Sequence, residues 1–365
     1  MKHTAKRWVI TFVCLQLAAL AAIAGLVAYT DPYFHYHAPF MEQFFYHLKN
    51  QRSQNDGVLK HFDYNAVISG TSMTENFKTS QLDELFGVKS IKVPFSGGSF
   101  KEINDNLRTG FTHNPDIKMV VRCLDLALLL TDPNWMRTDL GSYPTYLYND
   151  NPFDDVNYLL NRSIVFEYSL PMISDALAGG ASGITDFDSY SNWMPGSTLG
   201  SQTVLKGRGP FSAPTQFYEL RDAKRAVVQQ NITQNVTSLA EEYPDVTFYY
   251  FFSPYSAAWW GEVYQKGALE QQLEVEEMYI KAMLEYDNIR LFSFNTFFDI
   301  TTDLNHYKDT IHYSDWINQE ILRFMKDGKG QLTTENYQSY LEEVHEFYSN
   351  FDYNSLFEQY DDPTY

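Results

Sequence analysis

Short apolar segments alternate with longer segments of helical character along most of this chain. Five apolar segments have the length of strands and end in polar or glycine-containing turns, at residues 65–69, 88–95, the start of 117–130, 246–252 and 289–294. The segments that follow them predict helices near residues 100–111, 216–242 and 263–286. Parallel strands need crossover connections of this length. The pattern therefore predicts a three-layer α/β fold with a mostly parallel sheet.

The rest of the chain divides around this predicted domain. We expect an N-terminal segment, an aromatic connecting segment, the α/β domain and an acidic aromatic tail, at residues 1–30, 31–60, 61–330 and 331–365. Pro32 and Pro39 argue against a long helix in the connecting segment, because proline lacks the backbone donor. Residues 141–215 are rich in Gly, Ser, Pro and Tyr without strong periodicity, so we interpret them as an inserted cap region. Part of the tail is expected to dock as a helix.

The N-terminal segment has the pattern of a membrane anchor. Lys2, Lys6 and Arg7 precede an uncharged run at residues 8–29. As a helix rising about 1.5 Å per residue, this run spans roughly 33 Å, enough for a hydrocarbon core of about 30 Å. Basic residues on the N-terminal side favour an N-terminus inside the cell. We therefore expect a single-pass protein of the cell membrane whose body is extracytoplasmic.

A cleaved signal peptide is the alternative for the same segment. Ala22-Ile23-Ala24 resembles a signal-peptidase site before Gly25. The apolar run is long for a signal peptide, which favours a retained anchor. Cys14 lies inside the run without a lipobox around it, so we expect no lipidation there.

Charge and cysteine content exclude several classes of function. The formal net charge is −19, from 27 Lys and Arg against 46 Asp and Glu. A protein of this charge repels nucleic-acid phosphates, so we expect no nucleic-acid partner. The chain has 2 cysteines, which excludes a disulfide scaffold and a four-cysteine zinc site. Hydrophobic residues make up 44% of the chain, enough for a sizeable core.

Two strand-associated turns carry residues suited to nucleophilic chemistry. The first strand ends in Gly70-Thr-Ser72-Met-Thr-Glu-Asn76, and a serine in a tight strand-to-helix turn presents its hydroxyl at the sheet edge. Its alternative role is to cap the next helix. Far downstream, Asp309 and His312 stand three residues apart, so that the carboxylate could orient an imidazole that deprotonates the serine.

These motifs resemble those of the SGNH (GDSL-like) hydrolase superfamily. Residues 70–76 resemble its first block, with Ser72 as the nucleophile, and residues 309–312 resemble its last block, with Asp309 and His312 completing the triad. Residues 93–99 resemble the second block, whose glycine supplies an oxyanion-hole N–H; Gly97 matches best and would act together with the Ser72 N–H. The resemblance implies an SGNH/flavodoxin-like sheet and no cofactor.

The third block of that superfamily departs from the usual pattern in this chain. It normally ends a strand with G-x-N-D, whose asparagine completes the oxyanion hole, whereas this chain has Arg122-Cys-Leu-Asp125. The departure suggests the membrane-anchored bacterial branch that includes the D-alanine transfer protein of teichoic acid synthesis and exopolysaccharide acetyltransferases.

The resemblance to this branch implies a function at the cell envelope. We expect a serine esterase or O-acyltransferase that acts on envelope polysaccharide or a teichoic-acid-like polymer. Its partners would be the glycopolymer or an acyl donor, with a membrane-embedded acyltransferase as a further candidate. The alternative is a catalytically weak or inactive SGNH-fold protein that binds an envelope polymer or an assembly partner.

Four further positions are candidates for proximity to the substrate, namely Asn76, Gly98, Arg122 and Asp125. A buried structural pair is the alternative for the last two. A metal site could be drawn from five residues, namely His35, His37, His306, Asp309 and His312, but their spacing does not place them on one face, and we expect no metal site.

Overall fold

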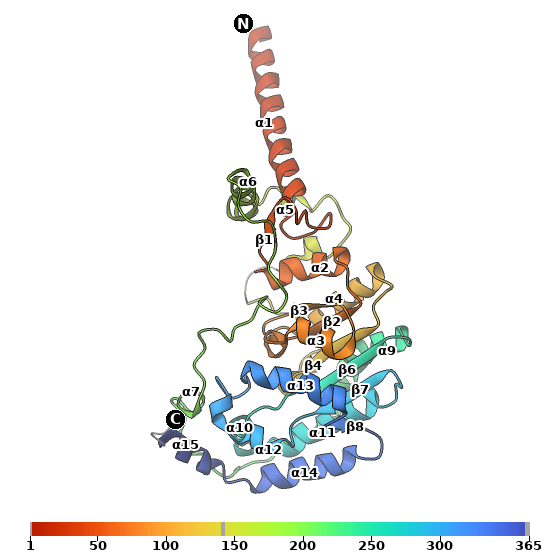
Figure 1. Cartoon of the computed structure of the whole chain (residues 1–365), viewed down its shortest axis with the longest axis vertical. Coiled ribbons are helices and arrows are strands. Elements are labelled where there is room, and N and C mark those ends of the chain that lie inside the picture. Colours follow the sequence, from red (N-terminus) through yellow and green to blue (C-terminus); the bar gives the residue numbers. More distant parts are fainter. Residues whose placement is uncertain (1, 140–142, 362–365) are drawn as a thin grey trace. The chain divides into compact units, whose positions relative to one another are not determined.

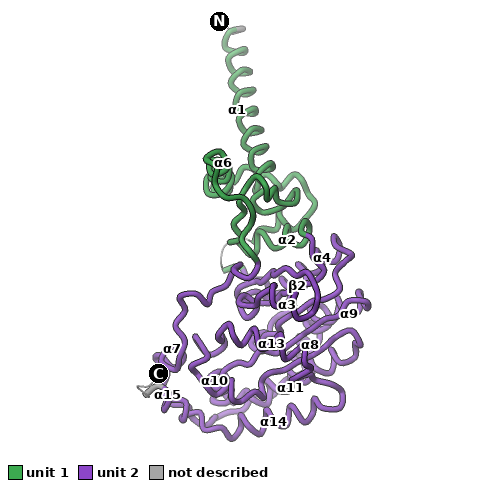
Figure 2. The backbone as a smooth tube through the Cα atoms, in the orientation of Figure 1, with its two compact units in different colours: residues 1–62, 138–186 green, residues 63–137, 187–365 purple. Residues whose placement is uncertain are grey.

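The computed structural model describes residues 2–139 and 143–361 and divides into two compact units. Unit 1 comprises residues 1–62 and 138–186, and unit 2 comprises residues 63–137 and 187–365 (Figure 2). The predicted cap region at 141–215 is therefore divided. Its first part belongs with the N-terminal segments, and its second part belongs with the sheet.

A six-stranded sheet forms the centre of unit 2 (Figure 1). Its strand order is β3-β2-β4-β6-β7-β8. The bounds are β2 Ala66–Gly70, β3 Ser90–Pro94, β4 Met119–Leu124, β6 Thr247–Phe252, β7 Ile289–Ser293 and β8 Gln331–Leu332. All neighbouring pairs are parallel except β7 with β8. The predicted α/β class with a mostly parallel sheet is confirmed, and β8 is a strand that the sequence pattern did not predict.

Complete burial explains why the central strands are so apolar. Every residue of β2, β3 and β4 is buried, as expected for parallel strands covered on both faces. The register places Ala66 between Ser90 and Met119. It thereby aligns the carboxyl ends of β2, β3 and β4, where Gly70, Pro94 and Leu124 lie.

Helices connect the strands of unit 2. The α-helices of five or more residues are α3 Thr79–Phe86, α4 Phe100–His113, α8 Asp222–Ile232, α9 Ser238–Glu242, α10 Ala257–Gln265, α11 Leu269–Met283, α13 Asp315–Asp327 and α14 Tyr337–Asn350. Shorter turns are η1 Ser72–Thr74, η2 Leu126–Leu128, α7 Ser201–Val204, η5 Thr233–Thr237, α12 Phe298–Thr301, η6 Leu304–His306, η7 Tyr353–Phe357 and α15 Glu358–Asp361.

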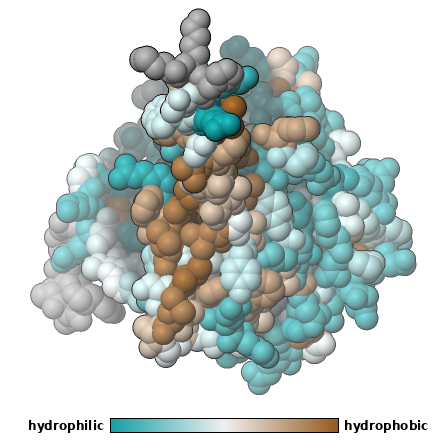
Figure 3. Space-filling view, turned by 90° about the horizontal axis from the view of Figure 1, so that it is seen from above, coloured by the Kyte–Doolittle hydropathy of each residue, from teal (hydrophilic) through white to brown (hydrophobic). Residues whose placement is uncertain are grey.

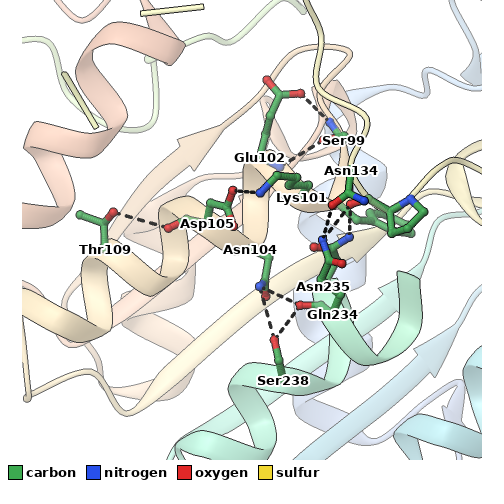
Figure 4. Close-up of polar contacts among 12 residues, drawn as sticks. Ser99, Lys101, Glu102, Asn104, Asp105, Thr109, Asn134, Gln234, Asn235 and Ser238 are labelled. Carbon is green, nitrogen blue, oxygen red and sulfur yellow. Dashed lines mark hydrogen bonds and ion pairs between the residues drawn. The ribbon is translucent and has the colours of Figure 1, made fainter. Parts of the chain in front are cut away.

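Helix α4 follows the second glycine-containing turn and is fixed at its start by a capping box. The Ser99 hydroxyl accepts from the Glu102 N–H, and Glu102 Oε2 accepts from the Ser99 N–H (Figure 4). One turn further, Asn104 Nδ2 donates to Gln234 O and Ser238 Oγ. These bonds join α4 to the segment from η5 to α9, so the chain leaving Gly97 has a defined direction.

Two predicted helices differ from the observed ones. The helix predicted at 216–242 begins at Asp222 and passes through the π-helical turn η5 before α9. The helix predicted at 263–286 is two helices, α10 and α11, separated around Gly267. Gly267 has φ +72°, and a Cβ there would lie 1.7 Å from Gln216 O. A close approach by a distant backbone segment therefore causes the break.

The C-terminal tail docks on unit 2 through α14. Tyr348 is fully buried and stacks on Trp260 at 4.5 Å between ring centroids. Tyr340 donates to Glu276 Oε1 of α11 over 2.5 Å. The tail is thus part of the core of unit 2.

Unit 1 begins with the apolar helix α1 (Lys2–Thr30), which ends before Pro32. Its other elements are β1 Phe45–Tyr46, α2 Gln51–His61, η3 Thr145–Leu147, α5 Val156–Leu159, η4 Ile164–Ser169, α6 Leu170–Leu177 and β5 Gly183–Ile184. Strands β1 and β5 pair in parallel. Within the aromatic connecting segment predicted at 31–60, β1 forms and α2 begins, both after Pro39.

Helix α1 is long and apolar enough to cross a membrane, from Thr4 to Thr30. Most of its large apolar side chains are exposed, among them Trp8, Leu15 and Leu17. Figure 3 views the molecule from above, and the most hydrophobic residues on that side are gathered in one band.

Candidate active site

Ser72 begins the short helix η1, two residues after β2 ends. The turn is tight, since a Cβ on Gly70 would lie 2.6 Å from the Thr74 side chain. The capping hydroxyl of η1 belongs to Thr71, whose Oγ1 accepts from the Met73 N–H. Thr71, and not Ser72, therefore caps this helix. The Ser72 hydroxyl is left for other contacts.

Ser72, His312 and Asp309 form a connected chain of hydrogen bonds. Ser72 Oγ lies 2.7 Å from His312 Nε2, and His312 Nδ1 lies 2.7 Å from Asp309 Oδ2. Both distances fall within the range for a nucleophile, its base and the carboxylate that orients the base. The residues that the sequence suggested as a triad are thus brought together.

The carboxylate of Asp309 is set up to remain charged. Its Oδ1 accepts from the backbone N–H groups of Ile311 and His312, each over 2.9 Å. Burial by itself would raise the pKa of Asp309, but the hydrogen bonds and charge of His312 and these backbone donors outweigh it and hold the pKa below its ordinary value. The anionic form suits a group that stabilises an imidazolium.

A hairpin-like loop after η6 holds Asp309 and His312 in place. Tyr307 and Tyr313 form an antiparallel bridge, and the Lys308 N–H donates to His312 O over 2.8 Å. Tyr307 is fully buried and donates to Pro254 O, at the carboxyl end of β6. The loop is therefore tied to the same edge of the sheet that carries Ser72.

Trp193 is a site residue that sequence reasoning missed. Its indole packs edge-on against the His312 ring, with 5.4 Å between centroids, and its Nε1–H donates to Ser72 O over 3.2 Å. Lys308 Nζ lies 4.8 Å from the centre of the indole. Trp193 comes from the predicted cap region, whose weak periodicity gave no signal for this position.

The backbone donors proposed for the oxyanion hole lie on neighbouring strand ends. Gly70 pairs with Pro94, and the Phe95 N–H donates to Gly70 O over 2.8 Å, so the two turns that follow run from adjacent points. Within the part of the chain that the structure describes, neither the Ser72 N–H nor the Gly97 N–H donates to a protein acceptor.

The backbone conformation of Gly97 favours glycine at that position. Gly97 has φ +55°, and a Cβ there would lie 1.9 Å from Arg137 Nη1. Arg137 is a second residue that sequence reasoning missed. Its Nη1 donates to Ser96 O over 3.1 Å, and its N–H donates to Glu102 Oε2 over the same distance. A guanidinium therefore lies directly beside the predicted oxyanion-hole glycine.

The alternative of a buried Arg122–Asp125 pair is wrong. The two residues are three positions apart at the end of β4, and alternation along a strand directs such side chains to opposite faces. The Arg122 guanidinium lies over the Phe100 and Tyr250 rings, at 5.5 Å and 5.7 Å from their centres. Burial lowers its pKa. Arg122 is a core residue of unit 2.

Asp125 stands behind the nucleophile turn. Its Oδ2 accepts from Thr71 Oγ1 over 2.7 Å, and its Oδ1 accepts from Tyr255 OH over 2.8 Å. Burial raises the pKa of Asp125, and the two hydroxyl donors act in the opposite direction. Asp125 therefore anchors the residue before Ser72.

Asn76 and Gly98 complete the predicted set. Asn76 is buried, and its Oδ1 accepts from the Trp193 N–H over 3.2 Å. A Cβ on Gly98 would lie 2.6 Å from the Phe95 side chain, and the Gly98 N–H donates to Phe95 O. Asn76 thus positions Trp193, and Gly98 closes the turn that carries Gly97.

The histidines considered for a metal site lie in different settings. His306 faces Asp303 at 3.3 Å, while His35 faces Asp155 of unit 1 at 3.2 Å. Among the described residues, no group of three or more His, Cys, Asp and Glu is placed to hold a metal ion.

Comparisons with known proteins give a weak likeness in structure and no likeness in sequence. No family model matches the chain, and no curated protein matches it. A solved structure from Streptococcus pneumonia, provisionally described as a platelet activating factor, is similar with a TM-score of 0.36 and 13% identity. The match covers 76% of this chain and 91% of that one. A likeness of this size supports no conclusion about activity. Any functional proposal for this chain rests on the geometry of the site.

Proposed function

We propose that this chain is a membrane-anchored serine esterase or O-acyltransferase of SGNH type. The observation that supports it best is the chain of two 2.7 Å contacts from Ser72 through His312 to Asp309. Structural serine–histidine contacts occur in proteins, but the further carboxylate on the second ring nitrogen is what orients a general base.

The proposed reaction has two acyl-transfer steps. His312 Nε2 takes the proton of Ser72 Oγ as that oxygen attacks an acyl carbonyl, and Asp309 stabilises the imidazolium. The N–H groups of Ser72 and Gly97 would receive the oxyanion. Collapse expels the alcohol, which takes the proton from His312, and leaves an ester on Ser72. Water or a polymer hydroxyl then attacks this ester while His312 takes its proton. The bond between the acyl carbon and Ser72 Oγ breaks, His312 returns the proton to Ser72 Oγ, and the acid or the acylated polymer is released.

The proposed setting is the outer side of the cell membrane. The basic N-terminal flank and the apolar α1 support an N-terminus inside and a body outside. The proposed acceptor is an envelope glycopolymer, with the acyl group supplied by a soluble donor or by a membrane-embedded acyltransferase. Protease added to intact protoplasts should digest the body, whereas protection of the whole chain would reject this topology.

The direct test of the serine is covalent labelling. Full-length protein in detergent is incubated with a fluorophosphonate probe, followed by peptide mapping. We expect the label on Ser72, its loss in Ser72→Ala, and its retention in the control Ser163→Ala, which changes an exposed serine of unit 1. Absence of labelling in a folded wild-type protein would instead support the non-catalytic alternative, a binding protein for an envelope polymer.

A further inference from the structure

Helix α6 of unit 1 carries an apolar face that is mostly exposed in the described chain, with Ile173 partly buried. None of its residues is buried. Even so, Leu170, Ile173 and Leu177 recur at helical spacing, and Phe166 of η4 lies one turn before them. Leu177 is 85% exposed and Phe166 is 64% exposed. We call these four residues the α6 stripe. In a water-soluble protein such a stripe normally faces the core.

The other side of α6 faces the rest of unit 1. Pro171, Met172 and Asp175 line a cavity of about 570 Å³ together with Phe45 and Tyr46 of β1. With 3.6 residues per turn, position 175 lies roughly opposite positions 173 and 177. The α6 stripe is therefore directed away from β1.

Specific contacts hold this region at the end of α1. Ile164 and Val165 of η4 share a core cluster with Val27 of α1. Thr30 Oγ1 donates to Ser169 Oγ over 2.8 Å. Since α6 continues directly from η4, it leaves at the level of the last turn of α1, as Figure 1 shows.

The length of α1 places this level at a membrane surface. A hydrocarbon core of about 30 Å needs about 20 helical residues. Counted from Trp8, the first residue after the basic flank, such a span ends near Val27. Val27 is fully buried within unit 1. A bilayer crossed by α1 therefore reaches the elements packed around Val27, among them η4.

We propose that the α6 stripe lies in the interfacial region of the bilayer that α1 crosses, as a second membrane contact of unit 1. Residues 163–181 contain Glu167 and Asp175 but no Lys or Arg, and Arg162 lies just before them, so the contact is mainly apolar. The proposal rests on α1 crossing a membrane and is independent of the proposed chemistry at Ser72.

The depth of a spin label tests this proposal. The full-length chain is reconstituted in phosphatidylcholine vesicles, with a nitroxide on Leu177→Cys in a Cys14→Ala background; Cys123 is fully buried and stays. Power saturation compares collisions with oxygen, which enriches in lipid, and with a water-soluble nickel chelate. The matched control is a label on Asp175→Cys, and a label on native Cys14 gives the value within the bilayer.

We expect the oxygen-to-nickel collision ratio at residue 177 to exceed that at residue 175 several-fold and to stay below the Cys14 value, as suits an interfacial depth. Equal, water-like ratios at 177 and 175 would overturn the proposal. A label at 177 shielded from both reagents would also overturn it, because a protein partner or a second copy would then cover the stripe. A water-like ratio at Cys14 would remove its premise.

Discussion

Thr71 Oγ1 donates to Asp125 Oδ2 over 2.7 Å, a contact that joins the turn before Ser72 to the end of β4. The SGNH type that we propose for this chain implies an oxyanion-hole asparagine at this strand end. Here the position instead holds a buried carboxylate that accepts from Thr71 and Tyr255. A carboxylate cannot donate to an oxyanion while ionised, so Asp125 supports the nucleophile turn without replacing the missing donor.

Small soluble esters should be turned over slowly by the wild-type protein. Loss of one oxyanion donor costs about 10²–10³ in rate. We expect weak hydrolysis of p-nitrophenyl acetate that Ser72→Ala abolishes, measured by release of nitrophenolate. Turnover unchanged in Ser72→Ala would remove the serine mechanism. Fast hydrolysis without an acceptor would show that another group fills the hole.

Asp309→Asn should lower kcat by about 10⁴, because an amide at this position favours the wrong tautomer of the base. The chain offers a matched control in Asp303, which caps η6 and faces His306 at the same three-residue spacing, away from the Ser72–His312 contact. Asp303→Asn should retain nearly full fluorophosphonate labelling. Equal losses in the two variants would mean that the loop had merely been disturbed.

Gly97→Ala should reduce activity by about 10²–10³, because an added Cβ strains the positive-φ turn and displaces the Arg137 guanidinium beside the oxyanion N–H. Its Cβ would lie 1.9 Å from Arg137 Nη1. Gly87→Ala is the control, since Gly87 also has positive φ, at +66°, but a Cβ there meets nothing within 4 Å. Rates of labelling by a fluorophosphonate compare the two. If both variants lose activity alike, backbone strain rather than the site is responsible.

Glu276 should make unit 2 less stable as the pH rises. Burial raises its pKa to about 7, against the hydrogen bonds from Tyr340 and Asn295. Its folded-state pKa lies above the unfolded value, so the unfolded chain loses this proton first. The contribution of Glu276 to stability is therefore fully present below about pH 4.5 and is lost as the pH rises through 7, by up to about 3 kcal/mol.

Thermal unfolding of the full chain between pH 5 and 8 measures this effect. Glu276→Gln should flatten the dependence, whereas Glu277→Gln, at the neighbouring partly exposed position, should leave it in place. An unchanged slope in Glu276→Gln would assign the pH dependence to other groups.

The sheet was predictable because its strands are buried on both faces. Such strands read as short apolar runs, and the predicted ranges 65–69, 88–95 and 246–252 agree with β2, β3 and β6 to within one or two residues. The break between α10 and α11 was not predictable, since it depends on Gln216 O approaching Gly267 from a distant segment.

The sequence by itself determined the apolar N-terminal helix, the mostly parallel sheet and the residue types at the two candidate site motifs, because local periodicity and composition encode burial. Only the tertiary structure brought Ser72 to His312, which is 240 positions away, and placed Trp193 against that imidazole. It also joined residues 138–186 to the N-terminal segments in unit 1. Such contacts join segments that are far apart in the sequence, and the local pattern of one segment does not predict its contacts with the other. The packed core decides them, because it fixes where each loop begins and ends.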